Sequence, residues 1–145
     1  MRRLLLCSLL AAALPALAAA PSREVAQLGA AEVQAAFAKG MPLVENDLYK
    51  VHASRRDAPG QAEVHTRDTD ILYVLQGTAT LVTGGSLVAA KEVAPDEIRG
   101  ARIDVGTTRE LAPGQVVVVP NGTPHWFQRV PGPFVYYVVK VTARE

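Results

Sequence analysis

The chain has 145 residues, with 15 Lys and Arg against 14 Asp and Glu, which gives a formal net charge of +1 at pH 7. A chain of this length forms one domain with a sizeable core. Its near-neutral charge gives no reason to expect nucleic acid or an anionic membrane surface as a partner.

The first 18 residues have the pattern of a secretory signal peptide. Arg2 and Arg3 are followed by an apolar run at residues 4–17, and Ala16 and Ala18 place small residues at positions −3 and −1 of a cleavage site. The run is shorter than the ~20 residues that span a bilayer, which disfavours a membrane anchor. Removing residues 1–18 leaves 13 basic against 14 acidic residues and removes Cys7, the only cysteine. We therefore expect a periplasmic or secreted protein without disulfides.

A short helix is expected within the N-terminal segment, residues 19–45. Apolar residues recur at a loose helical spacing between residues 24 and 39. Gly29 favours a start near Ala30 over one long helix, and Gly40 is the expected stop. We expect this helix to pack on the outside of the following domain or on a partner subunit, and a homodimer is one expected assembly.

From Leu43 onward the pattern changes to short strands separated by Pro/Gly turns, and we place the main domain at residues 46–145. Many short strands without intervening helices predict an antiparallel sandwich or barrel. Val116–Val119 and Phe134–Val141 are apolar on both faces, so each is expected to pack against a core and a second layer. A double-sheet jelly roll provides both.

Candidate ligands lie at the start of a buried strand in the stretch Glu63–Gly77. Glu63 and His65 are two residues apart, so both side chains leave the same face of an extended strand. Asp70 precedes the apolar run 71–75, which predicts a buried strand ending in the turn at Gly77.

A second stretch, Gly114–His125, repeats this form. It contains a turn, the strand at residues 116–119, a second turn at Pro120 to Gly122, and then His125 at the start of another strand. We therefore expect Glu63, His65, Asp70 and His125 to face one another across a barrel.

These stretches resemble the two motifs of the cupin family. The first motif is G-x5-H-x-H-x3,4-E-x6-G, and the chain offers Glu63-x-His65-x4-Asp70-x6-Gly77, in which Glu63 replaces the first histidine and Asp70 the glutamate. Pro59-Gly60 lies near the position of the leading glycine.

The second motif, G-x5-P-x-G-x2-H-x3-N, is matched by Gly114-x5-Pro120-x-Gly122-x2-His125, with Arg129 where asparagine is usual. The resemblance covers residues 46–141. It implies an all-β cupin fold, a double-stranded β-helix or jelly-roll barrel with a short N-terminal helix, that holds one divalent metal ion.

The resemblance implies that His65, Asp70 and His125 are metal ligands, since imidazole is the commonest ligand type for first-row metals. Glu63 has three interpretations: a further ligand, a catalytic base, or an ion-pair partner of Arg67. Two histidines with one or two carboxylates suit Fe(II) and Mn(II), with Zn and Ni as alternatives. Open coordination positions would allow a substrate or water to be polarised.

Three further positions have open interpretations. His52 alternates with Lys50 and Ser54, and is either a hydrogen-bonded strand residue or a lumenal one. Lys140 is either a strand-end residue that reaches solvent or a lumenal cation for an acidic substrate. Trp126 and Phe127 are adjacent, so one is expected to line the lumen and the other to face the outer layer.

Three hypotheses of function follow. The first is a metal-dependent enzyme of oxygenase, isomerase or lyase type that acts on a small organic molecule. The second is a non-catalytic barrel that binds a small ligand or a metal, and a third, weaker hypothesis is a structural barrel whose site has decayed. The cupin fold carries many functions, so the fold alone does not name the reaction.

Overall fold

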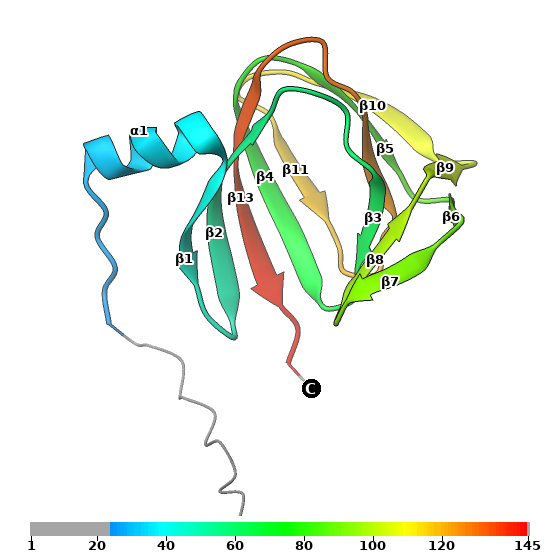
Figure 1. Cartoon of the computed structure of the whole chain (residues 1–145), viewed down its shortest axis with the longest axis horizontal. Helices are drawn as coiled ribbons and strands as arrows, with labels where there is room; N and C mark the ends of the chain where they lie inside the picture. Colours follow the sequence, from blue (N-terminus) through cyan, green and yellow to red (C-terminus); the bar gives the residue numbers. More distant parts are fainter. Residues whose placement is uncertain (1–23, 145) are drawn as a thin grey trace, which may run out of the picture.

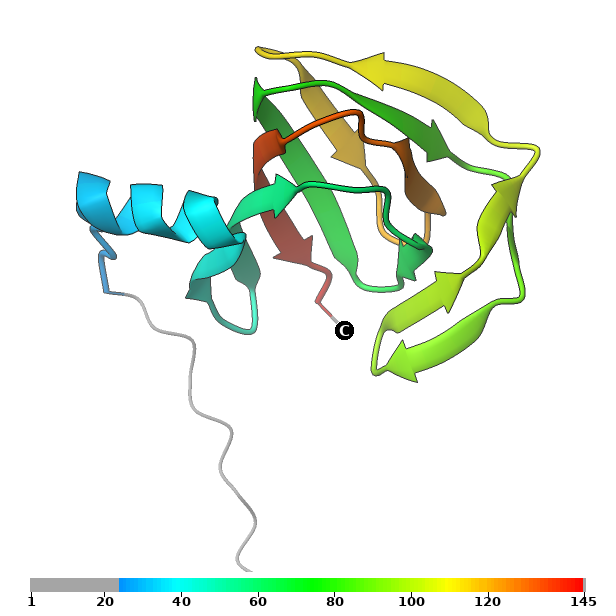
Figure 2. The ribbon, with the colours of Figure 1, turned by 45° about the horizontal axis from the view of Figure 1, so that its top comes forward.

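Two antiparallel sheets curve around a common interior (Figures 1 and 2). The computed structural model describes residues 24–144, and the predicted signal peptide lies outside them. One sheet has the strand order β1-β2-β13-β4-β11, in which the strands are β1 (Met41–Glu45), β2 (Tyr49–Arg56), β13 (Phe134–Thr142), β4 (Asp68–Gln76) and β11 (Val116–Val119).

The facing sheet has the order β10-β5-β12-β3-β8-β7. Its strands are β10 (Thr107–Leu111), β5 (Ala79–Thr83), β12 (His125–Arg129), β3 (Ala62–His65), β8 (Glu97–Gly100) and β7 (Lys91–Ala94). A two-stranded sheet, β6 (Ser86–Val88) with β9 (Arg102–Asp104), extends it on one side. All strand pairs of the described residues are antiparallel, so the predicted jelly roll is confirmed.

The one helix of residues 24–144, α1 (Ala30–Lys39), lies outside the barrel against β1 and β2 (Figure 1). It ends as expected at Gly40, whose left-handed φ of 67° lets its N–H bond the carbonyl of Ala36. The ring of Phe37 meets the outer face of the barrel edge-on at Tyr137, with centroids 4.7 Å apart. No helix in this part of the chain is long and apolar enough to cross a bilayer.

The sheet begins earlier than the expected domain start at residue 46. Residues 41–45 form β1 rather than a continuation of the helical segment, and they pair with β2 through the register Met41↔Ala53 to Glu45↔Lys50. Gly40 therefore marks both the end of the helix and the entry into the sheet.

The core lies between the two sheets. Alternation along β4 turns Leu72 and Val74 inward, while Phe134 on β13 is fully buried. The Phe134 ring packs against Phe127 and Tyr136, with centroids 5.6 and 5.1 Å away. This aromatic cluster anchors one end of the interior.

The expectation that β11 is covered on both faces is wrong. Val116 and Val118 are 61% and 56% exposed, and Tyr73 beside them on β4 is 45% exposed. The strand is an edge of its sheet, and α1 covers only the opposite end, so no second layer of the described residues reaches this outer face.

Candidate metal centre

A cavity of about 430 Å³ lies between the sheets. Its apolar lining comes from both of them, and consists of Leu72, Leu81, Val119, Phe127 and Val138. Polar and charged side chains form the remainder, and they include all four ligands predicted from the sequence.

Strand register brings the predicted ligands together. His125 on β12 pairs directly with Glu63 on β3, and His65 lies two residues further along the same face. One donor atom from each of these three side chains lies within 4.8 Å of the other two. Asp70 approaches from the opposite sheet, with Oδ2 3.6 Å from Nε2 of His65 and 4.0 Å from Nε2 of His125.

Both histidine rings present Nε2 to this cluster because their Nδ1 atoms are already engaged. Nδ1 of His65 lies 2.6 Å from Oε2 of Glu97, and Nδ1 of His125 lies 3.1 Å from the carbonyl oxygen of Thr123. A proton on Nδ1 satisfies both acceptors and leaves a lone pair on Nε2. Nε2 of His125 is buried and has no hydrogen-bond partner among the described residues.

Glu63 is held as a carboxylate by two guanidinium groups. Nη1 of Arg99 lies 2.6 Å from Oε2, and Nη2 of Arg56 lies 3.5 Å from Oε1. Burial alone raises the pKa of Glu63, but His125, at 3.3 Å, and the two arginines outweigh it and lower the pKa to about 2. These two arginines, on β2 and β8, are partners that none of the three interpretations of Glu63 included.

A pKa of about 2 argues against Glu63 as a catalytic base. A general base works best when its pKa lies near the working pH, and a carboxylate this acidic holds a proton weakly. The position of Glu63 is better suited to a ligand or to the pairing it already makes.

Lys140 lines the cavity, so of its two interpretations the lumenal position is the one found, and the solvent-reaching strand end is wrong. It is the register partner of Asp70 across β13 and β4, and its Nζ donates to both carboxylate oxygens at 2.7 and 2.8 Å. Burial, followed by the charge of Lys140, lowers the pKa of His65 and keeps its ring in the neutral form that binds metals.

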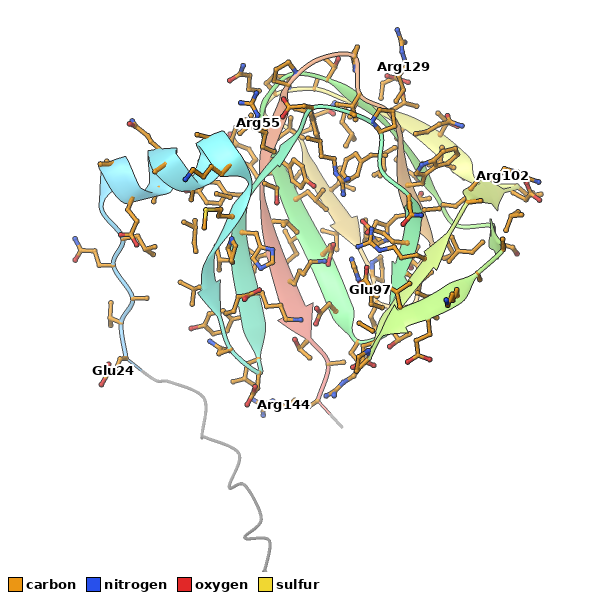
Figure 3. All side chains as sticks on the ribbon, viewed as in Figure 1. Glu24, Arg55, Glu97, Arg102, Arg129 and Arg144 are labelled. Atoms are coloured by element: carbon orange, nitrogen blue, oxygen red, sulfur yellow. The ribbon has the colours of Figure 1, made fainter. Side chains whose placement is uncertain are left out.

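Sequence reasoning missed Glu97 and Arg99, which lie on β8. The register pairs Arg99 with Glu63 and Glu97 with His65, so each ion pair joins direct cross-strand neighbours. Glu97 faces the interior of the barrel, whereas Arg102 projects at the periphery (Figure 3). The signal in the sequence is the complementary spacing of Glu-x-Arg on one strand and Glu-x-His on the other.

Arg56 was also missed, although it continues the alternation of Lys50, His52 and Ser54 along β2. Its guanidinium lies over the ring of Phe127 at 4.4 Å, and its Nε donates to the hydroxyl of Tyr136 at 3.1 Å. Both interpretations of His52 hold, since it lines the cavity and its Nε2 lies 2.7 Å from Glu45.

The adjacent aromatic residues on β12 divide as expected. Phe127 lines the cavity, while Trp126 packs with a second core cluster and its Nε1 donates to the carbonyl of Gly60 at 2.8 Å.

The donor set fits a divalent metal. Two imidazole Nε2 atoms, one of them buried with no hydrogen-bond partner in residues 24–144, converge with carboxylate oxygens of Glu63 and Asp70. Imidazole with carboxylate is a ligand combination of first-row metals, and the Nδ1 contacts are of the kind that orient metal-bound histidines. A metal at this point would compete with Arg99 and Lys140 for the two carboxylates.

Comparisons with known proteins agree with this architecture. A family model described as Cupin matches residues 19–145. The solved structure of BH2720 from Bacillus halodurans has a TM-score of 0.57 and 13% identity over 87% of this chain and 89% of its own. Protein NMB1881 from Neisseria meningitidis has a TM-score of 0.53 and 12% identity over 81% and 100%.

A third structure, the DMSP lyase DddQ from Ruegeria pomeroyi DSS-3, has a TM-score of 0.48 and 20% identity over 69% of this chain. The matched part is 41% of the length of that lyase. At these identities the likeness concerns the fold alone. A comparison with curated proteins finds no match.

Proposed function

Because the chain belongs to the cupin family, we propose that it binds one divalent metal ion in the barrel and acts as a metal-dependent enzyme on a small organic molecule. The proposed ligands are His65, His125 and Asp70, with Glu63 completing the set. The reaction is of oxygenase, isomerase or lyase type.

One observation carries the proposal: two histidines have Nδ1 engaged and Nε2 directed at carboxylates inside a cavity. Nε2 of His125 is buried, lies 3.3 Å from Glu63 Oε1 and has no hydrogen-bond partner among the described residues. A buried polar atom without a partner is unfavourable, and a metal ion bound there would supply one.

The donor types favour Fe(II) or Mn(II), with Zn and Ni as alternatives. When bound, the metal would supply Lewis-acid polarisation of a substrate oxygen. The protein's own contribution is to lower the pKa of His65 by burial, to fix the orientation of both imidazoles through Glu97 and Thr123, and to bind the substrate in a cavity closed on two sides by the sheets.

A non-catalytic binding barrel is the second candidate, and the closed set of ion pairs favours it. Glu63, Asp70 and Glu97 each already lie within ion-pair distance of a Lys or Arg. These ion pairs account for the charged side chains of the site without assigning them a catalytic role.

Turnover separates the two candidates. Protein purified from its native compartment without added metal should contain about one first-row metal ion per chain by elemental analysis. Incubated in air with a small-molecule extract of that compartment, it should deplete a compound detected by mass spectrometry, whereas His125→Ala should not. Metal without any depletion would favour the binding barrel.

We also propose that the protein is exported, on the basis of the basic start, the apolar run and the small residues at 16 and 18. N-terminal sequencing of material recovered outside the cytoplasm should place the first residue within about two positions of Ala19. An intact Met1 on the folded protein would contradict export.

A further inference from the structure

The charges that line the cavity balance before any metal binds. The lining has three carboxylates, Glu63, Asp70 and Glu97, and three permanent cations, Arg56, Arg99 and Lys140. With neutral histidines their sum is zero. A divalent ion on the proposed ligands would therefore leave a net charge of about +2 in a partly enclosed space, and such an excess is unfavourable unless an anion accompanies it.

The three cations are not equally committed to the carboxylates. Lys140 donates to both oxygens of Asp70. Arg99 bridges two acids, with Nη1 2.6 Å from Glu63 and Nη2 2.5 Å from Glu97.

Arg56 is different, because the one carboxylate that it approaches in the described part of the chain is Glu63, at 3.5 Å from Nη2. Its guanidinium nevertheless has a fixed position. Nε donates to the Tyr136 hydroxyl, and the planar group lies over the Phe127 ring. Nη1 lies beside Gly60, so Nη2 is the donor left for a ligand. Such a donor binds a carboxylate oxygen through a charge-assisted hydrogen bond.

The surroundings of Arg56 suit the remainder of an organic acid. Ser54 lines the same wall from β2, two residues from Arg56, and adds a hydroxyl. Leu72, Leu81 and Val138 provide apolar surface for a short carbon chain. The charged end and the apolar body of one small molecule thus have separate contacts.

We propose that the substrate or ligand of this barrel is a small organic acid, and that Arg56 binds its carboxylate beside the metal ligands. This inference rests on the proposed function, since the metal supplies the charge that the acid balances. Arg56 acts as the specificity residue that distinguishes an acid from a neutral molecule of the same shape.

The test uses butyrate and succinate, with butyramide and succinamide as neutral counterparts of nearly the same size. Each is titrated calorimetrically into metal-loaded wild type, Arg56→Gln, Arg56→Lys and Arg55→Gln. Arg55 is the matched control, because it lies one residue away on β2 and pairs outside the cavity with Asp57 at 2.8 Å.

We expect wild type and Arg55→Gln to bind at least one acid about tenfold or more tightly than its amide, as the loss of a charge-assisted hydrogen bond implies. Arg56→Gln should lose this preference, and Arg56→Lys should retain part of it because it keeps the charge without the planar fork. Wild type that binds neither acid more tightly than its amide, or Arg56→Gln that keeps the preference, would overturn the inference.

Metal affinity, measured on the same variants, separates this inference from the proposed function. Arg56 offers no metal ligand, so Arg56→Gln should bind metal at least as tightly as wild type and show the same near-ultraviolet circular dichroism. If wild type binds no metal, the proposed function fails; if metal binds without Arg56-dependent selection of acids, only the inference fails.

Discussion

Nδ1 of His65 lies 2.6 Å from Oε2 of Glu97, and the two residues are direct register partners on β3 and β8. The contact fixes which ring nitrogen carries the proton and turns Nε2 toward Asp70 and the cavity. Glu97 would therefore orient His65 toward a metal ion without being a ligand of that ion itself.

The first prediction concerns Glu97. Glu97→Ala removes the acceptor that orients His65, and metal affinity should fall about tenfold to a hundredfold. Glu97→Gln keeps an acceptor oxygen, so its metal affinity should fall less than that of Glu97→Ala. Calorimetric titration measures both, with Glu92→Gln at an exposed position of the neighbouring β7 as control. Unchanged affinity in Glu97→Ala would contradict this positioning role.

The second prediction concerns the acid stability of the metal-free protein. The pKa of Glu63 is about 2 in the folded protein against an ordinary value of 4.5, so the folded state favours the charged form. The resulting stabilisation is present above pH 4.5 and is lost as the pH falls toward 2, and it is on the order of 3 kcal/mol.

Glu63→Gln removes this contribution. The difference in unfolding free energy between wild type and the variant should shrink as the pH falls from 5 toward 2, measured by urea denaturation at each pH. Glu92→Gln should differ from wild type by a small and nearly constant amount. A constant difference for Glu63→Gln would show that Glu63 is not held as a carboxylate.

The third prediction concerns Gly77, the last residue of the first motif. Its φ is 78°, and a Cβ added there would overlap the carbonyl oxygen of Pro133. Gly84 has a similar φ of 75° with no heavy atom within 4 Å of such a Cβ. Gly84→Ala should therefore cost about 1 kcal/mol for the backbone conformation alone, and Gly77→Ala distinctly more. Equal losses by thermal unfolding would contradict the steric explanation.

The motifs predicted the fold because each fixed residue has a local physical role. Gly77 and Gly122 take a left-handed φ at turns, and the alternation on β4 separates inward Leu72 from outward Tyr73. Such constraints act within a few residues and can be read from spacing. The helix at Ala30–Lys39 was predicted on the same basis, from the glycines that flank it.

The ion pairs of the site could not be predicted in the same way. Glu63 and Arg99 are distant in sequence, and their contact depends on the register of β3 with β8, which no motif specifies. The apolar neighbours of Lys140 leave open whether it reaches solvent or the lumen, and only pairing with β4 reveals Asp70 as its partner. The local sequence pattern therefore predicted the candidate ligands, whereas their ion-pair partners can be identified only from the strand pairing in the folded sheets.

The fourth prediction is a homodimer. Val116 and Val118 on β11 lie beside Tyr73 and Ile71 on β4, and these four side chains form an exposed, uncharged patch at the open edge of the sheet. A second copy presents the same apolar face and edge, so a two-fold contact would cover both patches at once.

Light scattering after size exclusion should give twice the mass of one mature chain. Val118→Lys should shift the protein toward monomer, whereas Val105→Lys, at a turn where the valine is 98% exposed, should not. A monomeric wild type at micromolar concentration would contradict the dimer.

The most direct test of the central claim is calorimetric titration of metal-stripped protein with Mn²⁺, Fe²⁺, Ni²⁺ and Zn²⁺. Wild type should bind one equivalent of at least one of them, and His125→Ala should lose tight binding. His52→Ala should keep it, because the third histidine of the chain pairs with Glu45 instead. Affinity should decline as the pH falls through the region of about 6.5 and below, because neutral imidazole is the ligating form.

Bound metal should also raise the unfolding free energy by about 2.7 kcal/mol at a hundredfold excess over its dissociation constant. A wild type that binds none of the four ions more tightly than His125→Ala does would contradict the metal centre and leave the barrel as a metal-free binding protein.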